Sequence, residues 1–182
     1  KSPASSTDSK RCPVTVIIIS YNEEPNISYA VESVIGWTDK VYVVDSFSQD
    51  QTQKQATALG AEVIEHQFTS VGNQRNWAKQ NHAIPSEWIL FLDADEAVSK
   101  EMKEELQICL SNCPKEIKGY ITNIQFMFLG RWLKHGDLYQ FLIRLVRKDC
   151  GVYIDTEGFH EKMVVDGHVE KLKNHIIHDD HK

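Results

Sequence analysis

The chain has 182 residues, of which 41% are hydrophobic and 25% are charged, as in an ordinary globular domain with its own core. A formal net charge of -6 argues against a nucleic-acid-binding protein, which usually carries a basic face, and against a polybasic membrane anchor. No apolar stretch has the length of a transmembrane helix. The four cysteines are too scattered for a disulfide scaffold, which favours a reducing, cytoplasmic setting.

The first half of the chain alternates between strand and helix patterns. Residues 1–12 are polar and Ser-rich and are expected to form a flexible tail. Short apolar runs predict buried strands, and apolar residues at helical spacing predict helices between them. The strands are expected at 14–19, 41–44, 61–64 and 88–92, and the helices at 27–35, 50–59, 73–80 and from about residue 99. This alternation predicts a mostly parallel sheet with right-handed crossovers.

The second half is β-rich. Residues 120–128 and 138–147 are longer strand candidates, and Asp166-Gly167 between two apolar runs is a strong signal for a two-residue hairpin. We therefore expect a single α/β domain over residues 13–182, in which a Rossmann-like half with a mostly parallel mixed sheet precedes a β-rich half.

The fourth predicted strand ends in Asp93-Ala94-Asp95. Because side chains alternate along a strand, both carboxylates can point the same way, and two such groups at a crevice favour a bound Mg²⁺ or Mn²⁺. A helix cap or a polar turn is the alternative, since Asp is favoured in both.

Polar clusters follow two other predicted strands, at Ser20-Tyr21-Asn22-Glu23 and at 45–50. In an open parallel sheet these clusters and the aspartates would share one edge, where ligands bind. No glycine-rich phosphate loop follows the first strand, so a dinucleotide or ATP cradle of the usual kind is not expected.

Several of these segments together resemble the inverting family-2 glycosyltransferases. The resemblance rests on 17–24, on 43–52 and on Leu92-Asp93-Ala94-Asp95-Glu96. It is closer to the bacterial subgroup of lipopolysaccharide core glucosyltransferases, which share four further segments. These are Gly72-Asn73-Gln74-Arg75-Asn76-Trp77-Ala78, the Gly-Arg-Trp…His-Gly loop at 130–136, the Gln-x-x-x-Arg-Leu segment at 140–145 and His160-Glu161-Lys162.

The resemblance implies a GT-A fold and a nucleotide-diphosphate sugar as donor, with a UDP-sugar favoured. Tyr21, Asn22, Glu23 and Asp45 would line the nucleoside pocket, with Asp45 accepting hydrogen bonds from uracil or ribose. Arg75 would lie near the diphosphate or base, and the alternative for it is a solvated helix residue.

For the metal, the resemblance implies that Asp95 coordinates a Mg²⁺ or Mn²⁺ ion that stabilises the departing diphosphate. Asp93 would contact the ribose or the water shell of the metal. His160 would be a further ligand, or else a hydrogen-bonded core or loop histidine. His178, near the chain end, could lie close to the same metal.

Inverting transfer also needs a base for the acceptor hydroxyl. Glu161 is the first choice, with Asp155 and Glu157 in reserve. Trp132, His135 and Asp137 lie on a segment that could contact the acceptor, although the tryptophan could equally belong to the core.

The pattern departs from the wider family at two places. Many members carry Asp-Asp-Gly-Ser where this chain has Asp45-Ser46-Phe47-Ser48. The Gln-x-x-Arg-Trp motif of processive synthases is absent, which favours addition of one sugar, and the acceptor is expected to be a cell-envelope glycan or glycolipid.

The chain stops soon after His178, so a C-terminal helical portion that would support acceptor or membrane contact is expected to be missing. The expected location is the cytoplasm, with peripheral association at the inner face of the membrane as one option. Two alternatives stay open: a nucleotidyltransferase, and a catalytically silent nucleotide-sugar-binding domain of a larger protein.

Overall fold

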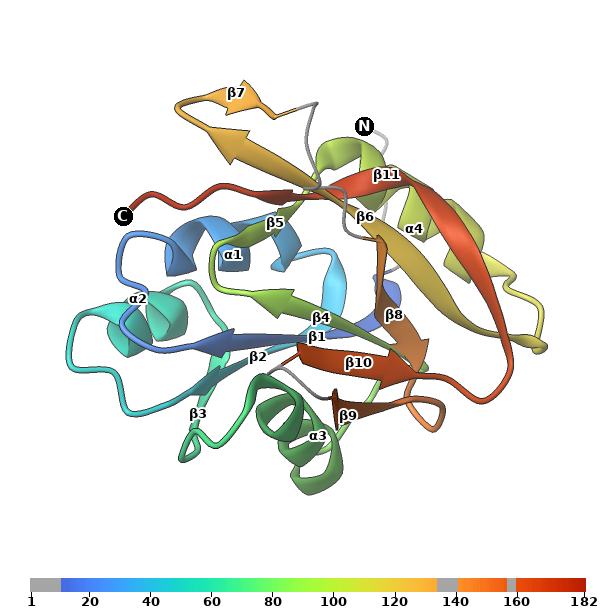
Figure 1. Ribbon diagram of the computed structural model, residues 1–182, viewed down its shortest axis with the longest axis horizontal. Helices are drawn as coiled ribbons and strands as arrows, with labels where there is room; N and C mark the ends of the chain where they lie inside the picture. Colours follow the sequence, from blue (N-terminus) through green and yellow to red (C-terminus); the bar gives the residue numbers. More distant parts are fainter. Residues whose placement is uncertain (1–10, 134–140, 157–159) are drawn as a thin grey trace, which may run out of the picture.

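The computed structural model describes residues 11–133, 141–156 and 160–182, with the backbone alone at Asp155 and His160. Its centre is a nine-stranded sheet (Figure 1). Eight of the strands have the order β3-β2-β1-β4-β8-β6-β11-β5, and the ninth, β7, pairs with β6 alone. A separate two-stranded sheet is made by β9 and β10. Among the described residues, no helix is both long and apolar enough to cross a bilayer.

The first half forms the alternating strands and helices that the sequence predicts. The elements are β1 (Cys12–Ser20), α1 (Ile27–Val34), β2 (Thr38–Asp45), α2 (Thr52–Ala58), β3 (Glu62–Glu65), α3 (Val71–Asn81), β4 (Trp88–Asp93), β5 (Glu96–Val98) and α4 (Lys100–Ser111). Strand β1 pairs in parallel with both β2 and β4, and β2 pairs in parallel with β3. Gly60, with a φ of 95°, follows the end of α2, where a left-handed residue commonly ends a helix.

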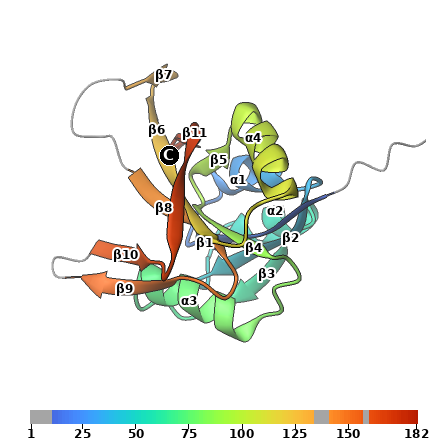
Figure 2. The ribbon, with the colours of Figure 1, turned by 90° about the vertical axis from the view of Figure 1, so that its right-hand side faces the viewer.

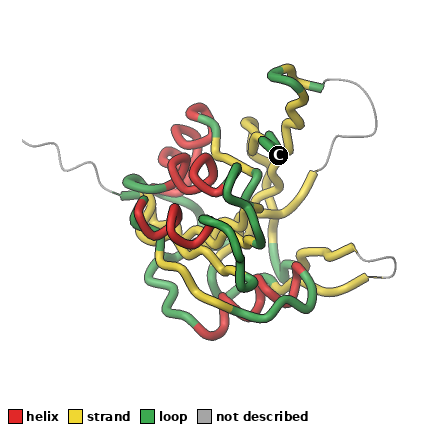
Figure 3. Tube along the Cα trace, turned by 90° about the vertical axis from the view of Figure 1, so that its left-hand side faces the viewer, coloured by secondary structure: helices red, strands yellow, loops and turns green. Residues whose placement is uncertain are grey.

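The inner strands are buried on both faces, which explains their continuous apolar runs. Along β1, Val16 and Ile18 point into a core shared with α1 and α4, whereas Ile17 belongs to a second core with Ala78 of α3. Helices therefore cover both faces of the sheet, as the two turned views show (Figures 2 and 3).

The second half adds β6 (Ile117–Phe128), β7 (Arg131–Trp132), β8 (Phe141–Arg147), β9 (Val152–Thr156), β10 (His160–Val164) and β11 (His168–His178). Strand β8 is antiparallel to β4 and β6, while β11 runs parallel to β6 and antiparallel to β5. The sheet is therefore mixed, with a parallel half and a β-rich half, as predicted.

The prediction of a two-residue hairpin at Asp166-Gly167 is wrong. Strand β10 pairs with β9, and β11 pairs with β5 and β6, so the turn connects two different sheets. The physical reason is long-range packing, because Leu172 and Ile176 of β11 are buried in the main core. A local turn signal does not outweigh that burial.

Candidate functional site

Two clefts open side by side at the edge of the sheet where β1 and β4 end. The first has a volume of about 490 Å³, and its lining includes Tyr21, Glu23, Gln74, Asp95, His178 and Lys182. The second has a volume of about 550 Å³, and its lining includes Arg75, Arg144, Tyr153, Glu161 and Lys162. Val71 and Asp93 line both clefts, so the carboxylate of Asp93 lies at the boundary between them.

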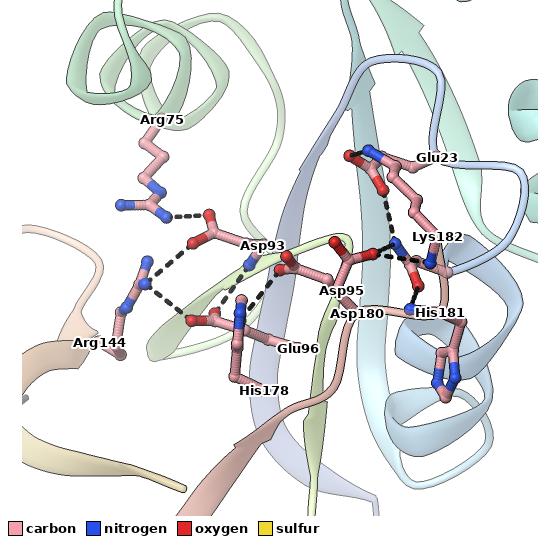
Figure 4. Close-up of polar contacts among 11 residues, drawn as sticks. Glu23, Arg75, Asp93, Asp95, Glu96, Arg144, His178, Asp180, His181 and Lys182 are labelled. Carbon is pink, nitrogen blue, oxygen red and sulfur yellow. Dashed lines mark hydrogen bonds and ion pairs between the residues drawn. The ribbon is translucent and has the colours of Figure 1, made fainter. Parts of the chain in front are cut away.

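Asp93 is held by two arginines (Figure 4). The Nη2 atom of Arg75 lies 2.5 Å from Oδ1 of Asp93, and Nη2 of Arg144 lies 3.1 Å from Oδ2. Burial disfavours the charged carboxylate, but the two guanidinium groups outweigh it and lower the pKa of Asp93 to about 2. Arg75 is only 3% exposed, so the alternative of a solvated helix residue is wrong.

Glu96 completes this charge network from β5. Its Oε1 accepts a hydrogen bond from Nη2 of Arg144 at 2.9 Å, and its Oε2 accepts one from the backbone N–H of Asp93 at 2.8 Å. Burial raises the pKa of Glu96, and the neighbouring Arg144 opposes that effect. Glu96 and the two arginines are buried, whereas the Asp93 side chain is 36% exposed to the clefts, and the ion pairs and hydrogen bonds among these four residues fix Asp93 in position.

Asp93 and Asp95 have different partners, contrary to the expectation that strand alternation would aim both the same way. Strand β4 ends at Asp93, and residues 94–95 form a turn before β5 begins. The alternation rule no longer applies there, so Asp93 contacts the arginines whereas Oδ1 of Asp95 lies 3.4 Å from Nδ1 of His178. A hydrogen bond to Asp95 raises the pKa of His178.

Asp95 and His178 are candidate metal ligands, and they lie next to each other. Their side chains are 25% and 29% exposed, and both line the first cleft. A carboxylate oxygen and an imidazole nitrogen are ligands that Mn²⁺ accepts. Within the described part of the chain no group of three or more His, Cys, Asp and Glu side chains is arranged for a metal.

Asp45 lies behind the first cleft and is fully buried. Its carboxylate accepts hydrogen bonds from the Ser20 hydroxyl at 2.8 Å, from the backbone N–H and hydroxyl of Ser48 at 2.8 and 2.5 Å, and from Gln53 Nε2 at 2.7 Å. Direct contact with a nucleoside would require Asp45 to release one of these donors. In the structure it ties the loop after β2 to the end of β1.

Phe47 in that loop has a φ of 63°, the left-handed region that favours glycine. It stands where the Asp-Asp-Gly-Ser pattern has its glycine, which explains why that pattern needs one. The neighbouring Asn22 also has a positive φ of 50°, and its Oδ1 accepts a hydrogen bond from the backbone N–H of Gln49 at 2.8 Å.

Glu23 lines the first cleft and connects it to the end of the chain. Its two carboxylate oxygens accept hydrogen bonds from Lys182 Nζ at 2.6 Å and from Asn26 Nδ2 at 2.8 Å. Asn26 also contacts Asp180 and the backbone N–H of His181. The segment after β11 is therefore fixed against the loop after β1, as the close-up shows (Figure 4). Tyr21, 56% exposed, lies at the same cleft.

Three successive residues of α3, Gln74, Arg75 and Asn76, contact three different parts of the molecule. Gln74 is fully buried and donates to Ser46 Oγ at 3.0 Å, Arg75 pairs with Asp93, and Asn76 exchanges two hydrogen bonds with the backbone of Tyr153 in β9. The segment 72–78 therefore joins the loop after β2, the boundary between the clefts, and the β9–β10 sheet.

Of the candidate bases, Glu161 lines the second cleft. It pairs in backbone register with Asp155, so both residues lie on the small sheet. Glu157 lies outside the described residues, as do His135 and Asp137. The proposed metal ligand His160 begins β10, where it pairs with Thr156. Trp132 is half-buried and packs edge-on against His175, with ring centroids 5.4 Å apart.

Sequence reasoning did not assign a role to Glu96, Arg144 or Lys182. Glu96 directly follows the Asp-x-Asp segment, and Arg144 lies in a segment matched to the subgroup, so both carried a weak signal. Lys182 carried none, because its approach to Glu23 depends on the course of β11.

A mixed α/β sheet with clefts at the carboxyl ends of its parallel strands is the arrangement of the GT-A fold class. The sequence of residues 15–108 matches the family described as Glycosyl transferase family 2. That match covers more than half of the residues, and the chain belongs to this family.

Among its relatives, an uncharacterized glycosyltransferase of Rickettsia typhi is 34% identical over 118 residues, which are 64% of this chain and 40% of that protein. One from Rickettsia conorii is 36% identical over 94 residues, covering 52% of this chain and 33% of that protein. The chain therefore matches less than half of the length of these relatives.

Two solved structures share the fold at 20% sequence identity. Glucosyl-3-phosphoglycerate synthase from Mycobacterium tuberculosis, in complex with Mn²⁺, UDP and glucosyl-3-phosphoglycerate, has a TM-score of 0.50 over 63% of this chain and 44% of that one. A mannosyltransferase from Pyrobaculum calidifontis, in complex with GDP-Man and Mn²⁺, has a TM-score of 0.52 over 63% of this chain and 36% of that one.

Proposed function

We propose that residues 13–182 form one GT-A domain of a metal-dependent inverting glycosyltransferase that moves a single hexose. The donor is a nucleotide-diphosphate sugar, with a UDP-sugar favoured, and the acceptor is a cell-envelope glycan or glycolipid. One observation carries the proposal: two clefts meet at Asp93, with Asp95 and His178 on the first and Glu161 on the second.

The first cleft is the donor site in this proposal. Tyr21, Glu23 and Asp93 line it, and Asn22 and Asp45 shape the loops around it. Asp45 reaches the nucleoside only by exchanging one of its present donors, so its main contribution is to hold Ser20 and Ser48. Arg75 acts through Asp93, whose carboxylate it fixes between the two clefts.

Asp95 and His178 would hold the metal, since both line the donor cleft and supply an oxygen and a nitrogen ligand. His160 is retained as a proposed ligand on the basis of the family resemblance. The bound ion would supply Lewis-acid stabilisation of the departing diphosphate. The Mn²⁺ complexes of the two solved relatives support this part of the proposal.

Glu161 is the proposed base. The acceptor hydroxyl oxygen attacks the anomeric carbon, its proton passes to the Glu161 carboxylate, and the bond from that carbon to the diphosphate oxygen breaks. Attack from the face opposite the leaving group inverts the configuration. The second cleft provides the acceptor side, because Glu161 and Asp93 both line it.

Within the family, we propose that this chain belongs to the subgroup of lipopolysaccharide core glucosyltransferases. Its support is the set of shared segments, because three of them meet at the second cleft: Arg75 from 72–78, Arg144 from 140–145 and Glu161 from 160–162.

The donor site is tested by thermal unfolding with UDP, GDP and dTDP, each with and without Mn²⁺. A ligand that binds the native state raises the midpoint by mass action, and we expect the largest Mn²⁺-dependent rise with UDP. The absence of a metal-dependent shift with all three nucleotides would overturn the proposed donor class.

The base is tested with Glu161→Gln, which keeps the shape of the side chain and removes its basicity. Donor binding should be retained and sugar transfer or donor hydrolysis lost. Val164→Thr is the control and should keep turnover, since Val164 is exposed on the same strand and is not in the lining of either cleft. Retained turnover in Glu161→Gln would move the role to Asp155 or Glu157, whereas donor binding without turnover in the parent chain would indicate a silent binding domain.

A further inference from the structure

The hairpin of β6 and β7 projects from the main body of the molecule (Figure 2). Its tip, residues 128–133, carries an unusual amount of exposed apolar surface. Phe128 is 61% exposed, Leu129 is 86% exposed and Leu133 is 37% exposed. Leu129 is thus among the most exposed hydrophobic side chains that the structure describes, so packing against the described part of the chain does not account for the residue.

The backbone of the turn does not account for it either. Leu129 has a φ of 48° and Gly130 a φ of 73°, which is the pair of positive angles that a two-residue type I′ hairpin requires. Asn followed by Gly satisfies that geometry, whereas a bulky leucine in the left-handed region is strained. A strained apolar residue at a solvent-exposed tip points to a contact made outside the chain.

The tip itself carries one positive charge, Arg131, and no negative charge within residues 128–133. From Ile117 to Leu133 the sequence contains no Asp or Glu, although the chain has a net charge of -6. Arg131 is exposed directly beside the turn, and Trp132 follows it. Exposed apolar side chains together with a cation and an amphipathic indole are the residue types that bind at the surface of an anionic bilayer.

We propose that the hairpin tip at residues 128–133 docks on an anionic lipid bilayer by inserting Phe128, Leu129 and Leu133 among the headgroups, with Arg131 near the lipid phosphates. One narrow tip suits shallow insertion into a bilayer better than a stable protein interface, which needs a much broader surface.

The position of the tip predicts a functional role for the lipid contact. On the same strand, Phe126 pairs in register with His178, which lines the donor cleft, so the tip begins two residues beyond the edge of the site. A docked tip would hold that edge close to the bilayer, where a lipid-linked acceptor lies. This role in bringing the site near its acceptor rests on the proposed function, whereas the lipid contact itself does not.

The test is flotation of the full chain with vesicles of phosphatidylcholine and phosphatidylglycerol, compared with vesicles of phosphatidylcholine alone. The chain should float with the anionic vesicles, and added salt should weaken the binding. Leu129→Asn should reduce the partition coefficient by roughly tenfold while leaving thermal stability equal or higher, because asparagine tolerates the left-handed region. Loss of binding and gain of stability in one variant separates a lost lipid contact from a damaged fold.

Ile108→Gln is the matched control, since Ile108 is 76% exposed and belongs to α4. In both views this helix lies apart from β7 (Figures 1 and 2). It should bind vesicles as the parent chain does. No flotation of the parent chain, or equal flotation of Leu129→Asn, would overturn the proposal. A change in self-association of Leu129→Asn without vesicles would overturn it in favour of a protein contact. Nucleotide-dependent thermal shifts, measured on the same variants without lipid, report on the donor site separately.

Discussion

The guanidinium of Arg75 lies 2.5 Å from the carboxylate of Asp93, which places a residue of α3 against the last residue of β4. Arg144 approaches the other oxygen of the same carboxylate from β8. Asp93 is therefore fixed by two elements far apart in the sequence, and its orientation at the boundary of the two clefts depends on both.

Removal of Arg144 should be strongly destabilising. Arg144→Met leaves the buried Glu96 without its cation and Asp93 with only one, and breaking such a pair costs about 3–5 kcal/mol. Urea unfolding gives the free energy of unfolding of the variant and the parent chain. The matched control is Lys40→Met, which breaks an exposed ion pair with Glu62 and should cost less than about 1 kcal/mol. Equal losses in the two variants would contradict a stabilising role for the buried pair of Arg144 and Glu96.

Replacement of Phe47 by glycine should stabilise the fold. Phe47 is 43% exposed and has a φ of 63°, so Phe47→Gly relieves left-handed strain worth about 1–2 kcal/mol. The free energy of unfolding should rise by the relieved strain minus the small entropic cost that glycine adds. Phe68→Gly is the control, because Phe68 is similarly exposed at 49% but has no positive φ, and it should not gain stability. A loss of stability in Phe47→Gly would show that the phenyl ring makes a compensating contact.

Removal of either proposed metal ligand should abolish the effect of Mn²⁺ on donor binding. We expect Asp95→Asn and His178→Gln to lose the Mn²⁺-dependent part of the thermal shift with UDP, because each removes one ligand from the same cleft. His168→Gln should keep the full shift, since His168 is an exposed residue at the other end of β11. A full metal response in His178→Gln would transfer the second ligand position to another residue, with His160 the first to test.

Removal of the Lys182 charge should weaken binding of a diphosphate more than it weakens the fold. Lys182 is 46% exposed and pairs with Glu23, so Lys182→Met should change the free energy of unfolding by less than about 1 kcal/mol. It also leaves the Glu23 carboxylate unneutralised in the donor cleft, which repels a diphosphate. The affinity for UDP should fall by roughly tenfold, since a charged contact contributes about 1.5 kcal/mol. Calorimetry with UDP and uridine separates the effects, because uridine carries no phosphate and its affinity should be unchanged.

Part of the site follows from the sequence alone. The apolar runs of β1, β2 and β4 are continuous because both faces of these strands are buried, and parallel strands end at one edge of the sheet. Asp95, Glu23 and Tyr21 were therefore expected at a common cleft, and all three line it. The α/β fold also follows from these local patterns. The resemblance to the family-2 glycosyltransferases rests on short sequence segments, and the family match over residues 15–108 bears it out.

Only the tertiary structure decides the partners of these residues. The turn after β4 separates the directions of Asp93 and Asp95, and β8 brings Arg144 to the first of them. Strand β11 leaves the Asp166-Gly167 turn to pair with β6, and this course alone places His178 beside Asp95. Local sequence determined the strands and the polar groups at their ends. Long-range burial of β8 and β11 determined which charges meet, because the energy of packing an apolar face exceeds that of any single turn.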